Sequence, residues 1–314
     1  MALKTDFAAL KEKLGGIAPL SRFAPSPTGY LHLGHIVNAI YVWGITESLG
    51  GKVILRLENH DRIRCKPAFE QELLDDLDWL GFQPDFGTTK SFRSGSNPYR
   101  QSDCAANYLL AFEHLKQKNL VYACECSRKE ILARSPQKQG SELRYDGHCS
   151  SKNLPLDAGH TLRVRIPDEE VVFDDLLIGK QTQNPAQQIG DFAIRDKHGN
   201  WTYQFCVVID DLHQNIDLII RGMDILSSTG RQIILRRMLQ PEHLQLSTLR
   251  YAHHPLLTDI KGRKLSKKDF DADIRSLRLQ GQRPSSLIGK AAFAAKLTEK
   301  EKPLKAANVV NLFD

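Results

Sequence analysis

One stretch decides the fold of this chain: Arg22-Phe-Ala-Pro-Ser-Pro-Thr-Gly-Tyr-Leu-His-Leu-Gly-His35. The pattern predicts a buried strand, a proline-rich turn and the first turn of a helix. His32 and His35 lie one helical turn apart, where that helix should begin. A helix N-terminus presents backbone N–H groups and the positive end of a dipole, so imidazoles placed there can help to hold phosphate. Two surface histidines would give the same pattern, so the hypothesis needs a second basic element.

The residues around this stretch predict a βαβ unit. We expect strands at 20–24 and 52–58, joined by a helix at 33–49 that Gly50 and Gly51 close. The second strand is a near-continuous apolar run, as in a buried parallel strand. This order indicates a nucleotide-binding α/β sheet with its ligand at the carboxyl ends of the strands.

The rest of the chain predicts two domains, one inserted into the other. Further helices are expected at 67–80, 99–118 and 229–239, short strands at 120–124, 161–166, 171–173 and 216–221, a hairpin over 191–211 that turns at 197–200, and two or three small helices after residue 268. The predicted parts are an N-terminal extension at 1–18, a catalytic domain in two halves at 19–120 and 191–260, an inserted domain at 121–190, and a lysine loop with C-terminal helices at 261–314.

The composition is that of an ordinary globular protein. The 314 residues are 41% hydrophobic and 25% charged, with a formal net charge of +6. This charge is compatible with a polyanionic partner, although many plain enzymes are equally basic. No apolar run reaches the roughly 18 residues of a membrane span, and no signal peptide is recognisable. We therefore expect a cytoplasmic protein without a membrane partner. A monomer is also expected, although no sequence feature determines the oligomeric state.

A second basic element lies far along the chain. Lys264-Leu-Ser-Lys-Lys268 comes after a glycine-containing turn, and alone it would most often be a solvated charge run. Together the two elements resemble the signatures of class I aminoacyl-tRNA synthetases, with His-Leu-Gly-His at 32–35 for the first and the lysine loop for the second. The segments at 22–29 and 220–224 and the strand-end Glu58 are similar to the glutamyl branch, and the resemblance covers roughly residues 19–290.

The resemblance implies a fold and a reaction. The fold is α/β: a Rossmann-like parallel sheet of the class I synthetases, an inserted zinc-bearing α+β domain and a short helical C-terminal part. The reaction is attack of an amino-acid carboxylate on the α-phosphate of ATP, with Mg²⁺, to give an aminoacyl adenylate. It requires positioning and cations around the phosphates. The matching catalytic residues are His32, His35, Lys264 and Lys267, and ATP would contact His32, Gly34, His35 and Lys267.

Recognition of glutamate needs a cation for its side chain and an acceptor for its ammonium group. Arg22 and Arg221 offer planar guanidiniums, and Glu58 offers a carboxylate. Structural roles are the alternatives: a strand end for Arg22, and for Arg221 an ion pair with Asp217 or Asp224. The resemblance places glutamate among Arg22, Phe23, Ala24, Pro25, Ser26, Glu58, Tyr203 and Arg221. One departure is visible, because Asn59 stands where the family usually has an acidic residue.

Three cysteines gather in the predicted insertion. Cys124, Cys126 and Cys149, with Tyr145 or His148 as a fourth ligand, could hold a structural zinc ion. Zinc chemistry alone favours the histidine, whereas the resemblance favours Tyr145. Three buried free cysteines are the alternative.

The acceptor of the activated glutamate is predicted from the length of chain after the lysine loop. Residues 269–314 are too few for a helical domain that reads an anticodon. The chain thus resembles the truncated paralogue of the glutamyl enzymes, the glutamyl-queuosine tRNA(Asp) synthetase family. That family transfers glutamate to queuosine at the wobble position of tRNA(Asp). Charging of a tRNA 3′ end and a non-enzymatic adenylate-pocket regulator remain as alternatives.

Overall fold

The computed structural model describes residue 12 and residues 18–135, 142–157, 159–240, 249–257 and 272–313. Its helices are α2 (Leu33–Ser48), α3 (Pro67–Leu80), α4 (Thr89–Arg93), η1 (Gln101–Asp103), α5 (Ala105–Gln117), α6 (Arg128–Arg134), α7 (Pro185–Gln188), α8 (Tyr203–His213), η2 (Met223–Ser228), α9 (Thr229–Leu239), α10 (Ile274–Leu279), α11 (Pro284–Ala294) and η4 (Ala306–Leu312). Its strands are β1 (Leu20–Phe23), β2 (Lys52–Leu55), β3 (Val121–Cys124), β4 (Thr161–Val164), β5 (Val171–Asp175), β6 (Gly179–Gln183), β7 (Ala193–Arg195), β8 (Leu218–Gly222) and β9 (Arg250–His254). The predicted lysine loop, with Lys264, Lys267 and Lys268, lies outside the described residues.

The predicted βαβ unit is confirmed. β1 and β2 pair in parallel, with Arg22 opposite Ile54, and α2 connects them. The helix begins at Leu33, as predicted, because His32 caps it: the His32 side chain accepts a hydrogen bond from the backbone N–H of Gly34. The second strand ends at Leu55, three residues before the predicted end.

A second parallel pair lies beside the first. β8 and β9 run in parallel, with Ile220 opposite Ala252. The backbone N–H of Asp217, just before β8, donates to the carbonyl of Leu20 at the start of β1. The beginnings of β1 and β8 are therefore neighbours, and their carboxyl ends reach the same side of the molecule. This is the edge at which a parallel α/β sheet binds its ligand.

The predicted hairpin over 191–211 is wrong in its second half. β7 forms, but Trp201 makes only a single bridge to Arg195, and Tyr203 begins the buried helix α8. Helical spacing was present in this segment but was outweighed by its aromatic residues; the residues that carry the spacing are Phe205, Val208, Ile209 and Leu212. The predicted long helix at 99–118 is likewise shorter, because a 3₁₀ turn precedes Ala105.

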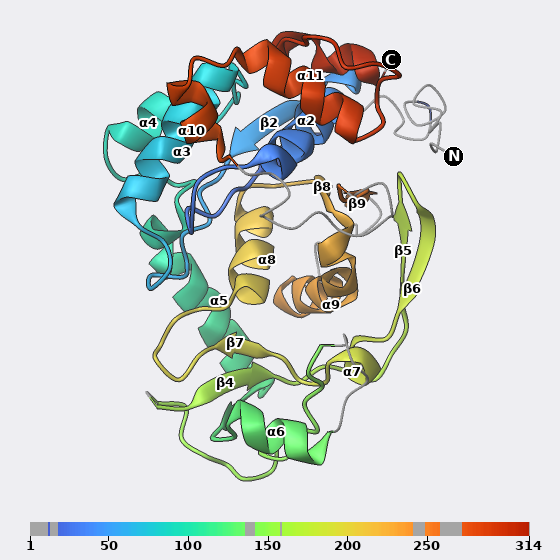
Figure 1. The fold of residues 1–314 in the computed structure, drawn as a ribbon. Coiled ribbons are helices and arrows are strands. Elements are labelled where there is room, and N and C mark those ends of the chain that lie inside the picture. Colours follow the sequence, from blue (N-terminus) through green and yellow to red (C-terminus); the bar gives the residue numbers. More distant parts are fainter. Residues whose placement is uncertain are drawn as a thin grey trace.

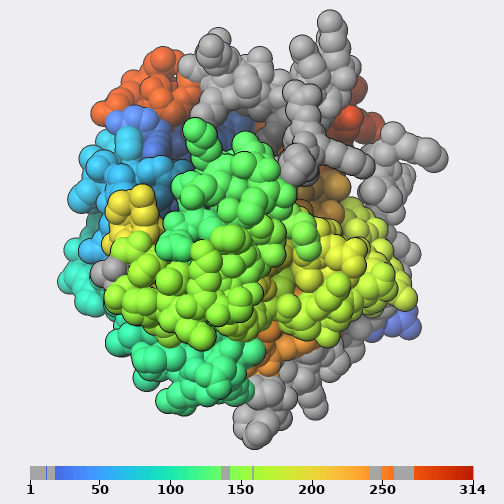
Figure 2. All heavy atoms as spheres, turned by 90° about the horizontal axis from the view of Figure 1, so that it is seen from below, coloured from blue at the N-terminus to red at the C-terminus, as the bar shows by residue number. Residues whose placement is uncertain are grey.

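The lower part of the molecule in Figure 1 is built around a separate antiparallel sheet, in the order β3-β4-β7. Seen from below in Figure 2, the green segment that includes α6 and β4 spreads across this face. The β5–β6 hairpin instead joins β9 through Asp175 opposite Tyr251, in the order β6-β5-β9-β8. Strands of the predicted insertion thus contribute to the antiparallel sheet and also to the sheet that contains β8 and β9. The predicted domain boundaries stay predictions.

The end of the chain covers the βαβ unit. The small helices predicted there are α10, α11 and η4, and Figure 1 shows α10 and α11 over α3 and α2. The contact is close: a Cβ atom at Gly44 in α2 would lie 2.2 Å from the ring of Phe313. In the part of the chain that the structure describes, no helix is both long and apolar enough to cross a bilayer.

Candidate functional site

A cavity of about 930 Å³ opens at the carboxyl ends of β1 and β8, beside the start of α2. Eight of the predicted site residues line it: Arg22, Ala24, His32, Gly34, His35, Glu58, Tyr203 and Arg221. Residues that are far apart in the sequence, from Arg22 to Arg221, therefore line the same cavity. The geometry brings the two predicted halves of the site, for amino acid and for phosphate, into the same cavity.

Three residues of the predicted glutamate site, Phe23, Pro25 and Ser26, do not line the cavity. Phe23 is 1% exposed and packs against Trp43 in the core. Ser26 donates its hydroxyl hydrogen to the carbonyl of Glu58 at 2.7 Å, and the carbonyl of Pro25 accepts from the Glu58 N–H at 3.1 Å. Ser26 and Pro25 shape the loop that presents Glu58.

The two histidines hold the start of α2 together. His32 Nδ1 accepts from the Gly34 N–H, and His35 Nδ1 accepts from the His32 N–H, both at 3.1 Å. Because both Nδ1 atoms are acceptors, each neutral ring carries its hydrogen on Nε2, and an N–H donor is what a phosphate oxygen needs. A Cβ atom at residue 34 would lie 2.9 Å from the His32 ring, so glycine is required for this arrangement.

Arg221 is a buried cation held by neutral groups. Its side chain is 4% exposed and donates to His253 Nε2 at 3.0 Å, Gln232 Oε1 at 2.7 Å and Thr229 Oγ1 at 2.9 Å. Among the described residues it makes no ion pair, so the predicted alternative of a pair with Asp217 or Asp224 is not found. A buried charge without a counter-charge is costly, and a ligand carboxylate would provide the missing charge.

Arg22 is in the opposite situation, because it pairs with a buried carboxylate. Its Nε lies 3.0 Å from Asp211 Oδ1, and Asp211 is also bound by the fully buried Arg56 at 2.7 Å. Arg56 in turn binds Glu58 Oε1 at 3.0 Å and so fixes the carboxylate at the cavity wall. In this network the two positive charges of Arg22 and Arg56 are balanced by the two carboxylates of Glu58 and Asp211.

Tyr203 lies at the first residue of α8 and faces the same cavity. Burial raises the pKa of its phenol, and the nearby charge of Arg221 only partly offsets this effect. The phenol therefore keeps its hydrogen at neutral pH and can donate it to a ligand.

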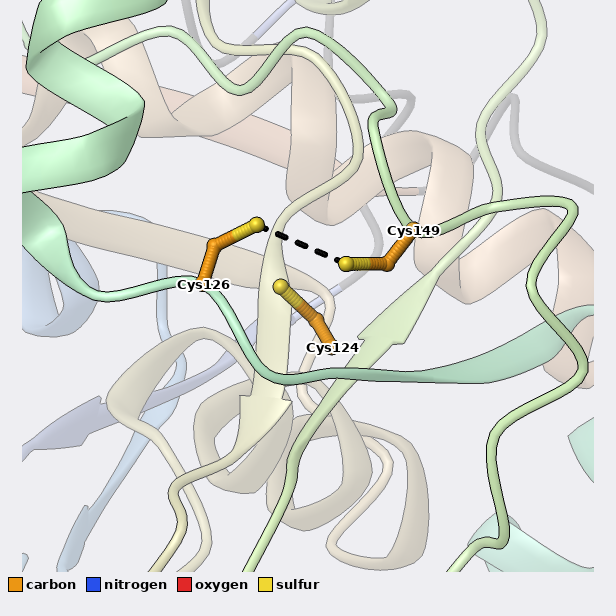
Figure 3. Close-up of side chains that lie close together, drawn as sticks. All are labelled: Cys124, Cys126 and Cys149. Carbon is orange, nitrogen blue, oxygen red and sulfur yellow. Dashed lines mark hydrogen bonds between the residues drawn. The ribbon is translucent and has the colours of Figure 1, made fainter.

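The predicted cysteine cluster is formed. The Sγ atoms of Cys124, Cys126 and Cys149 all lie within 4.8 Å of one another, and Figure 3 shows the three side chains pointing together. The Sγ atoms of Cys126 and Cys149 are 3.4 Å apart, and the two cysteines are not bonded. Tetrahedral zinc with Zn–S bonds of about 2.3 Å needs sulfurs roughly 3.8 Å apart, so the donor set fits a metal.

Tyr145, rather than His148, is the fourth group at the cluster. Its phenol oxygen accepts from the Cys124 thiol at 3.3 Å and from the Cys149 N–H at 2.9 Å, and it lies 4.0 Å from Cys126 Sγ. His148 is exposed, and its ring is not among the grouped ligand atoms.

Comparison with known proteins identifies the family. The model of the class I tRNA synthetases (E and Q), catalytic domain, matches residues 20–298. The chain belongs to this family. It is therefore an enzyme of the ligase type, and membership implies ATP and tRNA as substrates.

Individual relatives match this chain over different shares of their own length. The chain is 39% identical to a glutamyl-Q tRNA(Asp) synthetase of Burkholderia mallei over 79% of this chain and 80% of that protein. It is 33% identical to the Symbiobacterium thermophilum protein of the same name over 93% and 91%. Glutamate–tRNA ligase 2 of Acidithiobacillus ferrooxidans is 36% identical over 85% of this chain and 56% of that protein. The resemblance predicted from the motifs is thus confirmed.

A solved structure agrees in fold. The glutamate–tRNA synthetase of Elizabethkingia anophelis matches with a TM-score of 0.75 and 25% identity, over 95% of this chain and 66% of that chain. The present chain spans about two thirds of that structure. The parallel sheet and mixed α/β content expected of a class I synthetase are therefore confirmed.

Several residues that line this cavity or support its wall were not predicted. Asn38 lines the cavity and could have been found, because it lies one helical turn after His35. His254, Asp224 and Asp273 also line it, and no spacing rule connects them to the first signature. The role of the buried Arg56 could not be predicted from the sequence, because the residue lies within an apolar strand segment.

Replacing Asp211 with Asn should destabilise the synthetase strongly. The change leaves two buried guanidiniums, Arg22 and Arg56, without their shared counter-charge, which typically costs about 3–5 kcal/mol in the free energy of unfolding. Asp75→Asn is a matched control, because its partner Arg93 is one-third exposed, and it should cost less than about 1 kcal/mol. Urea denaturation measures both; equal losses would contradict the buried network.

The same carboxylate predicts a pH dependence. Burial raises the pKa of Asp211, but attraction to Arg22 and Arg56 outweighs burial and holds the pKa below its usual range. The folded state thus binds the proton less readily than the unfolded state. The stabilisation is complete above the usual pKa of about 3.9 and is lost as the pH falls below it. In Asp211→Asn this acid-side loss should be smaller.

Proposed function

We propose that the enzyme activates L-glutamate with ATP to form glutamyl adenylate without tRNA, and then transfers glutamate to queuosine at the wobble position of tRNA(Asp). One observation carries the first step: the cavity beside the start of α2 is also lined by Arg221, a buried cation that pairs with no carboxylate of the described residues. A substrate with a side-chain carboxylate supplies that partner.

Glutamate lies in this cavity between Arg221 and Glu58. Its side-chain carboxylate pairs with Arg221, the guanidinium that no carboxylate in the described ranges contacts, with Arg22 beside it. Its ammonium group is attracted to Glu58, whose carboxylate Arg56 fixes at the wall. The hydroxyl of Tyr203, the first residue of α8, donates a hydrogen bond to the bound glutamate. The backbone from Phe23 to Ser26 gives the floor its shape.

ATP lies at the start of α2. The glutamate α-carboxylate attacks the α-phosphorus, a new P–O bond forms, and pyrophosphate leaves with the electrons of the broken P–O bond. His32 and His35 donate from Nε2 to phosphate oxygens, and Gly34 permits close approach. Lys264 and Lys267, outside the described residues, supply further positive charge. Mg²⁺, which takes oxygen ligands, accompanies the triphosphate, and Asp224 and Asp273 are carboxylates at the cavity wall.

The acceptor is inferred from the relatives. The chain aligns with 80% and 91% of the two glutamyl-Q tRNA(Asp) synthetases and with 56% of the glutamate–tRNA ligase. The similarity thus extends through most of the former and about half of the latter. This supports queuosine as the acceptor, with the ribose 3′ end of tRNA(Glu) as the second candidate.

Incubation with labelled glutamate, ATP and total tRNA tests the proposal. We expect label in tRNA(Asp) that carries queuosine, at an anticodon-loop fragment after nuclease mapping, and none in tRNA that lacks queuosine. Lys267→Ala should reduce labelling by at least about 100-fold, because one transition-state contact is typically worth that much. Label at the 3′ end of tRNA(Glu) would establish the second candidate instead.

We also propose that the cysteine cluster holds a structural zinc ion through Cys124, Cys126, Cys149 and Tyr145. All four groups come from the protein, so the site would be closed and would contribute to folding rather than to chemistry. Such a site would connect the end of β3 to the segment before β4. The boundaries of a zinc-bearing domain at 121–190 remain part of this proposal.

Protein purified without chelator should contain one zinc ion per chain by elemental analysis. Cys149→Ser should lose the metal and lower the melting temperature, because the ion stabilises only the folded state. Cys104→Ser, a buried cysteine away from the cluster, is the matched control and should keep it. Tyr145→Phe should weaken binding more than His148→Ala; wild-type protein without zinc would refute the site.

A further inference from the structure

Behind Arg221, on the side away from the glutamate site, lies a buried histidine–aspartate pair. The Nε2 atom of His253 accepts from Arg221 Nε at 3.0 Å, and its Nδ1 atom lies 2.5 Å from Asp175 Oδ2. His253 is fully buried and Asp175 is 4% exposed. β5 and β9 pair in parallel next to this point, so the contact is built into the sheet.

The surroundings of Asp175 determine where the proton lies. Its carboxylate accepts backbone N–H groups of Leu177, Ile178 and His253 at 3.0–3.2 Å. Its other hydrogen-bond partners among the described residues are these three backbone donors, and a carboxylate can only accept, so Nδ1 of the ring carries a hydrogen. Burial lowers the pKa of His253, and the Arg221 charge adds to this effect against Asp175. The neutral ring therefore leaves Nε2 bare as the acceptor for Arg221.

This arrangement orients Arg221 without cancelling its charge. Three of its five N–H groups donate to His253, Gln232 and Thr229, one from each nitrogen. One N–H remains on each terminal nitrogen, and two such donors match the two oxygens of a carboxylate. A carboxylate in the place of His253 would compensate the cation, as Asp211 does for Arg22. The imidazole instead fixes the plane of the guanidinium and holds the Asp175 carboxylate on its far side, so that a ligand carboxylate can contact Arg221 directly.

We propose that His253, held in one tautomer by Asp175, is a positioning residue that sets Arg221 for the side-chain carboxylate of the substrate and thereby selects glutamate. The inference rests on the proposed activation of glutamate. It assigns to the pair a role in binding and none in the chemical step.

Asp175→Asn tests the tautomer. The N–H₂ group of the new amide must face one of the groups that donated to Asp175. Facing His253 Nδ1 costs the least free energy, because the ring can move its hydrogen to Nε2. That hydrogen then opposes Arg221 Nε–H. We expect the KM for glutamate in pyrophosphate exchange to rise about 10- to 100-fold, the loss expected for a hydrogen bond to a charged group. The KM for ATP should change less than about twofold.

The second variant is His253→Phe, whose ring has no nitrogen that can accept from Arg221. Alone, it should raise the KM for glutamate by a factor similar to that of Asp175→Asn. In the double variant Asp175→Asn should add little, because the ring tautomer through which Asp175 acts is no longer present. A structural role would give additive losses and would also raise the KM for ATP.

A histidine–aspartate pair remote from the cavity provides the control. His160 Nδ1 lies 2.8 Å from Asp157 Oδ1 on the surface, and Asp157→Asn should change neither KM. Melting temperatures verify that each variant is folded. If Asp175→Asn is folded and its KM for glutamate is unchanged, or if the double variant is additive, the positioning role is overturned while the proposed function stands. Absence of glutamate-dependent exchange in wild-type protein would overturn both.

Discussion

The site depends on a buried guanidinium that no carboxylate among the described residues contacts. Arg221 lies at the carboxyl end of β8, where its hydrogen-bond partners in the described part of the chain are a histidine, an amide and a hydroxyl. Removing a cation from water is unfavourable unless it is paired and hydrogen-bonded. The fold supplies the hydrogen bonds, and in the proposed function the side-chain carboxylate of the substrate supplies the pairing. Binding and selectivity for a carboxylate then have the same physical origin.

The two arginines of the cavity contribute in different ways. Arg22 shares Asp211 with Arg56, and this network connects β1, the segment after β2, and α8. Its charges are balanced, so it stabilises the cavity wall and fixes Glu58. Arg221 is oriented by its hydrogen bonds, but no carboxylate of the described residues contacts it. A binding site that needs both rigidity and an available charge can obtain them from two neighbouring cations with different partners.

Much of this arrangement can be predicted from the sequence, where the information is local. Apolar periodicity, Pro67 and the glycines that end α2 and α3 predicted the βαβ unit and α3, because helix ends and buried strands have short-range rules. The spacing of Cys124, Cys126 and Cys149 predicted a cluster that the structure contains. Local rules failed at Tyr203, where aromatic residues indicated a strand and tertiary packing produced a helix. The Asp175–His253 pair was beyond reach, because only the pairing of β5 with β9 brings the two residues together.

The most direct test of the central claim compares two amino acids that differ in one group. Pyrophosphate exchange should be measured with L-glutamate and with L-glutamine, which has nearly the same shape but no side-chain charge, in wild-type protein and in Arg221→Gln. We expect wild-type protein to prefer glutamate by at least about 100-fold in kcat/KM, because glutamine leaves the buried cation unpaired. Arg221→Gln should lose most of that preference. Equal use of both amino acids by folded wild-type protein, or an unchanged preference in the variant, would contradict the account.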